Sequence, residues 1–187
     1  MKKLIFTILA ILGFQISALG EEIHFDNEIY KLKFSALAPL TKGYGNEYFK
    51  GNENVSDWSK MIGIYYYPSE DNPLEFAQDF DQIVDDTDNS MLLKLVENKK
   101  TNQAVMSFLV NNSENGKKYF EYDVYKFEKH PAHGMVLSKY ASKHYFKNDA
   151  DITKLAQQIK ENNDKYLELL IISPTPNVVE KDIAIGN

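Results

Sequence analysis

Short links between successive strand-like segments constrain the fold of this chain more than any other feature. Between residues 91 and 146, four segments have strand patterns, and only a few residues separate each from the next. They are Met91 to Glu97, Gln103 to Asn111, Lys117 to Glu128 and Gly134 to Phe146. Links this short join antiparallel neighbours, because a parallel crossover needs about a dozen residues or more. The pattern predicts an antiparallel meander.

Further strand patterns precede the meander. Residues 30–36 alternate between apolar side chains and Lys or Ser, which is the period of a half-buried strand. Residues 58–68, "WSKMIGIYYYP", are apolar on both alternating sets, as in a strand that is covered on both faces. The intervening "KGYGNEYFKGNEN" is interpreted as a loop or a short edge strand among glycines and asparagines.

Two helices are predicted from apolar stripes at helical spacing. The first begins at Asn72, which can cap it, with Pro73 at the first helical position and Glu75 three residues after the cap. The second spans residues 151–172 and ends before a Ser-Pro-Thr-Pro run. Its stripe is expected to lie on the sheet and consists of Ile152, Leu155, Ala156, Ile159, Tyr166, Leu167 and Leu170.

Together these elements predict an α+β fold. We expect a twisted antiparallel sheet of about six to seven strands with one helix on each face, an αβα sandwich, because two striped helices can then cover strands that are apolar on both sides. Residues 21–176 are expected to form a single domain, since no repeat, linker or second long apolar run divides them. Residues 177–187 are expected to be a loose tail or an added edge strand.

Element order and aromatic-rich strands also carry a family resemblance. "GYGNEYF" and "DWSKMIGIYYYP" precede the first helix, "KKYFEYDVYKF" is followed by "GMVLSKYASKHYF", and an amphipathic helix closes the domain. In this order the chain resembles the PsbP-like αβα sandwich family of photosystem II accessory proteins and their relatives. The resemblance implies a role as an extrinsic assembly or stabilising factor of a larger membrane complex. It assigns no functional residue.

Residues 1–20 have the pattern of a secretory signal peptide of bacterial type. Two lysines follow the first methionine, the apolar run from Leu4 to Phe14 is too short to span a bilayer, and small residues end the segment. The predicted mature chain begins at Glu21. Because the chain contains no cysteine, neither a lipid-modified cysteine nor a disulfide can form. We expect an exported protein, periplasmic or extracellular, without stable membrane insertion after cleavage.

Charge restricts the expected partners. The formal net charge is −6, and it becomes −8 when the two lysines of the signal peptide are removed. Every positive charge is a lysine, because the sequence contains no arginine. An acidic chain without arginine lacks both a basic stripe for nucleic acid and the planar fork that recognises phosphate. We therefore expect no nucleic-acid partner.

Histidines and acidic runs were considered as metal ligands. His130 and His133 lie in "KHPAHG", which predicts a hairpin turn, and His144 lies about 33 Å further along an extended strand. His130 and His133 could bind zinc together with Glu128, but no fourth ligand is evident in the sequence. The run "DDTDNSMLLKLVE" has the spacing of a calcium loop but lacks the glycine at its sixth position. We expect no metal and no cofactor.

Catalytic motifs are missing from the sequence. The serine-hydrolase elbow, the zinc-protease motif and the glycine-rich phosphate loops are all absent. Glu121 and Asp123 point to one face of a predicted strand, as the carboxylates of a glycosidase would, although such pairs are common on solvated faces. No catalytic residue is expected, and a hydrolase with a carboxylate site remains the alternative.

Aromatic side chains are the best candidates for a binding surface. They alternate along the strands, so each face receives rings with polar tips, as at interfaces and in sheet cores under helices. Core packing is the simpler interpretation, and a platform for a protein, glycan or small molecule is the other. The candidates for that surface are Trp58, Tyr65 and Tyr67. We expect an exported, non-enzymatic binding or assembly factor of unknown ligand; alternatives are an extracytoplasmic hydrolase and a secreted host-interaction protein.

Overall fold

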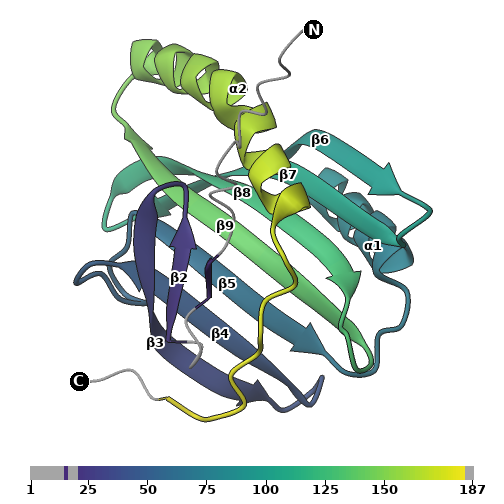
Figure 1. Cartoon of the computed structure of the whole chain (residues 1–187). Helices are drawn as coiled ribbons and strands as arrows, with labels where there is room; N and C mark the ends of the chain where they lie inside the picture. The colour runs from purple at the N-terminus through teal and green to yellow at the C-terminus, as the bar shows by residue number, and fades with distance from the viewer. Residues whose placement is uncertain (1–14, 17–20, 184–187) are drawn as a thin grey trace, which may run out of the picture.

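Figure 1 shows the computed structural model of the chain, in which residues 15–16 and 21–183 are described. The predicted signal peptide lies outside the described residues, apart from positions 15 and 16. In chain order the elements are β1 (Gln15–Ile16), β2 (Glu22–Phe25), β3 (Glu28–Ala38), β4 (Gly43–Lys50), β5 (Lys60–Tyr67), α1 (Pro73–Asp85), β6 (Ser90–Asn98), β7 (Gln103–Glu114), β8 (Lys117–Lys129), β9 (Met135–Phe146) and α2 (Asp149–Ile172).

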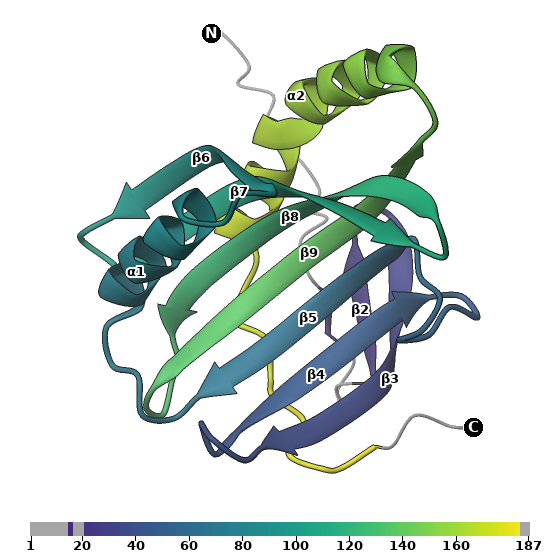
Figure 2. The ribbon, with the colours of Figure 1, turned by 180° about the vertical axis from the view of Figure 1, so that it is seen from behind.

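All described strands belong to one antiparallel sheet with the order β1-β2-β3-β4-β5-β9-β8-β7-β6. Two meanders, β2–β5 and β6–β9, meet where β5 pairs with β9, from Lys60 opposite Ser142 to Tyr67 opposite Met135. The connection through α1 carries the chain from the middle of the sheet to its far edge at β6, as Figure 2 shows. The predicted antiparallel meander of four strands is confirmed.

Left-handed backbone conformations close the tight turns. Asn115 and Gly116 both have positive φ, at 51° and 75°, as the turn signal between β7 and β8 predicts. Gly134, between β8 and β9, has φ 72°, and a side chain there would collide with the carbonyl oxygen of Tyr67. The predicted hairpin at "KHPAHG" is therefore confirmed, with the glycine required both by its backbone conformation and by the close approach.

α1 begins as its sequence predicts. The Asn72 side chain accepts a hydrogen bond from the backbone N–H of Glu75 at 3.5 Å and donates one to the Glu75 carboxylate at 2.8 Å, with Pro73 as the first helical residue. The inner face of the helix packs on β6, β7 and β8. Its cluster consists of Phe76, Ala77, Phe80 and Val84 with Ala104, Met106, Phe108 and Phe127 of the sheet.

α2 packs on the opposite set of strand side chains, including Val105, Leu109 and Val124. Because side chains alternate along a strand, this is the face turned away from Ala104 and Met106. Only Ile159, Leu167 and Leu170 of the helix are buried, and Ile152 and Leu155 are half-buried. The expectation that the whole stripe lies on the sheet is therefore wrong for the first turns, which rise away from the strands in Figures 1 and 2.

The predicted fold class, a six- to seven-strand αβα sandwich, is also wrong. The sheet has eight antiparallel strands, β2–β9, with the two-residue β1 paired to β2. Both helices pack mainly at the β6–β9 end of the sheet and do not form layers over it. At the other end, β2 and β3 curl over one face of the sheet (Figure 1). Phe25 and Tyr30 thereby join the core cluster that contains Leu167. The segment 43–50, interpreted as a loop or a short edge strand, is β4, an interior strand that pairs with β3 and β5.

The segment after α2 is held along the sheet as far as residue 183. The amide of the fully buried Asn46 pairs with the backbone of Val179, accepting from its N–H at 2.7 Å and donating to its carbonyl at 2.9 Å. Ile183 then makes two backbone hydrogen bonds with Ser35. In the part of the chain that the structure describes, no helix is long and apolar enough to cross a membrane.

The unequal burial of α2 predicts unequal effects of the same substitution. Leu170→Asp should lower the free energy of unfolding by about 4 kcal/mol, because it places an unpaired charge at a fully buried position. Leu155→Asp, in a half-buried turn, should cost about 1 kcal/mol. Denaturant unfolding of both variants measures the difference. Equal losses would contradict the placement of the first turns of α2.

Candidate binding site

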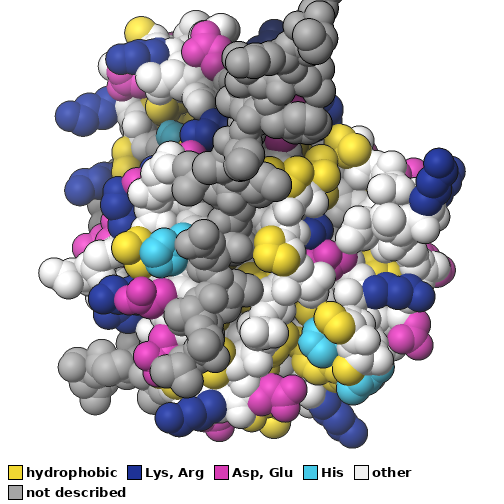
Figure 3. Space-filling view, in the orientation of Figure 1, with side chains coloured by type: hydrophobic (Ala, Val, Ile, Leu, Met, Phe, Trp, Pro, Cys, Tyr) yellow, Lys and Arg dark blue, Asp and Glu magenta, His cyan; other side chains and the backbone are white. Residues whose placement is uncertain are grey.

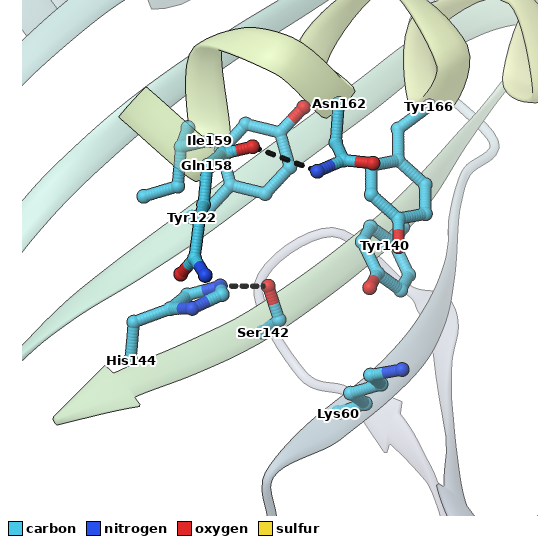
Figure 4. A pocket seen from close by; sticks show the side chains of 9 residues that line it. All are labelled: Lys60, Tyr122, Tyr140, Ser142, His144, Gln158, Ile159, Asn162 and Tyr166. Atoms are coloured by element: carbon cyan, nitrogen blue, oxygen red, sulfur yellow. Dashed lines mark hydrogen bonds between the residues drawn. The ribbon is translucent and has the colours of Figure 1, made fainter. Parts of the chain in front are cut away.

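A hollow of about 230 Å³ lies between α2 and the strands β5, β8 and β9 (Figure 4). The sheet contributes the floor, and the helix contributes one wall. Nine side chains line it: Lys60, Tyr122, Tyr140, Ser142, His144, Gln158, Ile159, Asn162 and Tyr166. We refer to this hollow as the α2 pocket.

Two simple periodicities bring these residues together. Tyr140, Ser142 and His144 are alternate residues of β9, so their side chains point to the same face of the sheet. On α2, the lining residues recur at intervals of three to four, which places them along one side of the helix. Lys60 joins them from β5, because it is the register partner of Ser142.

Tyrosine rings form the deepest part of the pocket. The Tyr140 and Tyr166 rings are stacked, with centroids 4.5 Å apart and an angle of 21° between their planes. Tyr122 lies beside Tyr166, with ring centroids 6.1 Å apart, and its hydroxyl donates to Asn163 at 2.9 Å. Burial raises the pKa of both Tyr122 and Tyr140 well above the ordinary value, so these hydroxyls are neutral at physiological pH.

Ser142 and His144 form a hydrogen-bonded pair in the pocket, with 2.8 Å between the serine Oγ and the histidine Nε2. Burial of His144, and next the positive charge of Lys60, lower the pKa of the imidazole, so the ring is neutral at pH 7. Among the described residues no carboxylate hydrogen-bonds to this ring. The pair therefore lacks the third group that orients histidine in serine hydrolases.

The charge of Lys60 is held in place by Glu28. The Lys60 ammonium lies 2.9 Å from one oxygen of the Glu28 carboxylate, and Lys50 lies 2.6 Å from the other. The Tyr30 hydroxyl also donates to this carboxylate, at 2.9 Å. Burial alone would raise the pKa of Glu28, but the hydrogen bonds from Lys50, Lys60 and Tyr30 outweigh it and lower the pKa to about 2.

A second hollow, of about 500 Å³, lies on the other side of α2, against β6 and β7. Most of its walls are apolar, and Met91 is more than half exposed there. Its lining residues are Met91, Leu93, Leu109, Ala156, Ile159, Lys160, Asn163 and Asp164. It offers fewer hydrogen-bonding groups than the α2 pocket, because only three polar side chains reach it.

The structure does not gather Trp58, Tyr65 and Tyr67 into one patch. Tyr65 and Tyr67 pack in the cluster under α1, where the Tyr65 hydroxyl donates to Glu47 at 3.1 Å. Trp58 lies in a different cluster, around Phe49, with the Lys143 ammonium 4.5 Å from its ring centroid. All three are half-buried.

Glu121 and Asp123 do share one face of β8, and a lysine lies between them. The Lys139 ammonium is 3.0 Å from an oxygen of each carboxylate. Burial raises the pKa of Asp123 to about 6, against the lowering effect of Lys139. The three side chains are largely buried and lie on the sheet face opposite the α2 pocket, since they occupy the alternate positions of β8 and β9.

The histidines separate as their spacing predicts. His130 and His133 both contact Tyr66: the His133 Nε2 lies 2.9 Å from the Tyr66 hydroxyl, and the His130 ring centroid lies 4.8 Å from the Tyr66 ring. They are thus packed against a neighbouring strand end and are not free side chains of an open turn. Within residues 15–16 and 21–183, no group of three or more histidine or acidic side chains has the arrangement of a metal site.

The sequence did not predict the α2 pocket, and of its residues only His144 was considered as a possible metal ligand. The alternation of Tyr140, Ser142 and His144 was visible as a strand pattern, and it could have placed all three on one face. What the sequence does not reveal is that β5 pairs with β9 and that α2 crosses this part of the sheet.

Comparison with known proteins identifies a family but no activity. A model of an uncharacterised family matches residues 17–174, so the chain belongs to that family. This assignment corrects the PsbP-like resemblance, which rested on element order alone. Searches of curated proteins and of solved structures gave no match.

The ion pair of Glu28 with Lys60 predicts that the free energy of unfolding depends on pH. Because the pKa of Glu28 falls from 4.5 to about 2 on folding, its stabilising contribution is present above pH 4.5 and is lost as the pH falls towards 2. Glu28→Gln should lower the free energy of unfolding by about 1 kcal/mol at pH 7, with the difference shrinking to zero near pH 2.

The matched control is Glu22→Gln, which removes a partly exposed carboxylate 3.3 Å from Lys31. It should change stability little at any pH. Denaturant unfolding from pH 2 to pH 7 measures both variants. A Glu28→Gln effect that is independent of pH would contradict the role given to this carboxylate.

Proposed function

We propose that this protein is an exported, non-enzymatic binding protein that holds a small molecule in the α2 pocket. The observation that carries the proposal is the composition of that pocket. Stacked tyrosine rings and Ile159 supply an apolar surface, and Ser142, His144, Gln158, Asn162 and Lys60 supply polar groups beside it. An apolar surface with a few convergent polar groups is the usual make-up of a small-molecule site.

Binding is favoured over hydrolysis by what surrounds the reactive groups. No carboxylate is among the residues that line the α2 pocket in the described part of the chain. Glu121 and Asp123, the carboxylate pair of the hydrolase alternative, are paired with Lys139 on the other face. The backbone of Ser142 is engaged in the sheet on both sides, so no oxyanion-binding N–H groups face its hydroxyl.

Export and the class of partner are supported by the sequence. Residues 1–20 have the signal-peptide pattern described above, and an intact mass that begins at Glu21 in protein from its native host would support export. The acidic net charge argues against a nucleic-acid partner. On the face drawn in Figure 3, lysine and acidic side chains are interspersed, and no basic stripe is visible.

A pocket-filling variant tests the proposal. Asn162 lies on the exposed side of α2 and lines the pocket, so Asn162→Trp should fill the pocket without unfolding the protein. Screening a diverse set of small fragments by thermal shift should identify some that raise the melting temperature of the wild-type protein. We expect Asn162→Trp to abolish these shifts, because the indole takes the volume that the fragment needs.

Glu161→Trp is the matched control, because it adds the same ring to the adjacent exposed position, which does not line the pocket. It should leave the thermal shifts unchanged. Two results would contradict the proposal: a screen in which no fragment stabilises the protein, or shifts that persist in Asn162→Trp.

A further inference from the structure

We propose that the ligand of the α2 pocket is a small aromatic carboxylate, with its ring against Tyr140 and Tyr166 and its carboxylate at Lys60, Ser142 and His144. This inference rests on the proposed binding function and adds the chemical class of the ligand. Three features of the pocket carry it: the sign of its charge, its hydrogen-bond donors, and the shape of its apolar wall.

The only fully charged side chain that lines the pocket in the described chain is the ammonium of Lys60. Its partner Glu28 does not fully neutralise this ammonium, because the single negative charge of the Glu28 carboxylate is shared with Lys50, which lies 2.6 Å from it. About a third of the Lys60 side chain is exposed. A ligand carboxylate can therefore approach Lys60 without displacing Glu28, and a ligand cation would be repelled.

Hydrogen-bond donors lie beside this ammonium. Lys60 and Ser142 are directly opposite in the β5–β9 ladder, so their side chains leave the sheet next to each other. Ser142 and a neutral His144 share one hydrogen bond, and in the tautomer in which Ser142 donates to Nε2 the Nδ1–H of His144 remains to donate. In Figure 4 the Gln158 amide lies beside His144. A carboxylate, which only accepts, matches this set.

The apolar wall favours a flat group. Tyr140 and Tyr166 are nearly parallel, and the buried Ile159 lies on the helix side of the pocket. Because these two rings stack on each other, an aromatic ring can contact the edge of the pair and Ile159, in the edge-to-face geometry that aromatic pairs also prefer. The volume of about 230 Å³ is smaller than the ~300 Å³ at which sites for drug-sized ligands begin. The ligand is therefore a compact molecule.

The charge of the pocket also favours a carboxylate over a phosphate ester as its ligand. A phosphate carries more charge and is usually met by several cationic groups or by the fork of arginine, and this chain has no arginine. Lys60 alone lines the pocket as a cation. One ammonium with one or two neutral donors suits a single negative charge.

Isothermal titration calorimetry at pH 7 with three probes tests the inference. Benzoate carries both the ring and the charge, benzamide keeps the ring without the charge, and acetate keeps the charge without the ring. Benzoate should bind about tenfold more tightly than benzamide, because one charge-assisted hydrogen bond is lost with the amide. Acetate should bind more weakly than benzoate by at least about tenfold, because it cannot contact the tyrosines.

Two lysine variants test whether Lys60 binds the carboxylate of benzoate. Lys60→Met should weaken benzoate about tenfold and leave benzamide unchanged. Lys31→Met is the matched control, because Lys31 pairs with Glu22 and not with Glu28, and it does not line the pocket. It should leave both affinities unchanged. Circular dichroism of each variant confirms that the fold is retained.

The outcomes separate this inference from the proposed function. Equal affinities for benzoate and benzamide, or equal effects of Lys60→Met and Lys31→Met, would overturn the carboxylate assignment. So would the absence of benzoate binding in a protein whose fragment-induced thermal shifts are lost in Asn162→Trp. In each of these cases the pocket would still be a binding site, whereas failure of the pocket itself appears as persistent shifts in Asn162→Trp.

Discussion

The pairing of β5 with β9 is the interaction on which the rest of the structure depends. It joins two meanders into one sheet through eight consecutive register pairs, and β5 and β9 contribute the fully buried Ile62, Ile64 and Ala141 to the core. The same ladder sets Lys60 beside Ser142. A slip of one residue would turn the side chains of β5 to the opposite face, so the buried core also fixes the register of the pocket.

Alternate residues of β9 point to opposite faces of the sheet. Tyr140, Ser142 and His144 face α2, and Lys139 with Ala141 faces the other side, where Lys139 pairs with Asp123. Tyr122, Tyr140 and Tyr166 pack in or against the core cluster that contains Leu167 and Leu170 of α2, and the same three rings line the α2 pocket. Packing and binding thus depend on the same side chains, which is why we chose the exposed Asn162 to test the pocket.

Local signals in the sequence predicted local structure well. The Asn72 cap, the Asn115-Gly116 turn and the hairpin closed by Gly134 each follow from residues that are adjacent in the chain. The interior strand β4 was interpreted as a loop or a short edge strand because of its glycines, whereas Gly43 is small because it packs against the Tyr66 carbonyl. The strand count was too low because β2 was not predicted, and the αβα sandwich was wrong because both helices pack mainly at the β6–β9 end of the sheet. The pocket was missed because its walls come from β5, β8, β9 and α2, whose contacts no local pattern encodes.

The most direct test of the pocket as the ligand site is a crystal structure of the protein soaked with a fragment that raises its melting temperature. We predict electron density for that fragment between α2 and β9, in contact with Tyr140 and Asn162 and within hydrogen-bonding distance of Ser142. Density confined to another surface, such as the apolar hollow beside Met91 or the region around Trp58, would contradict the assignment of the site.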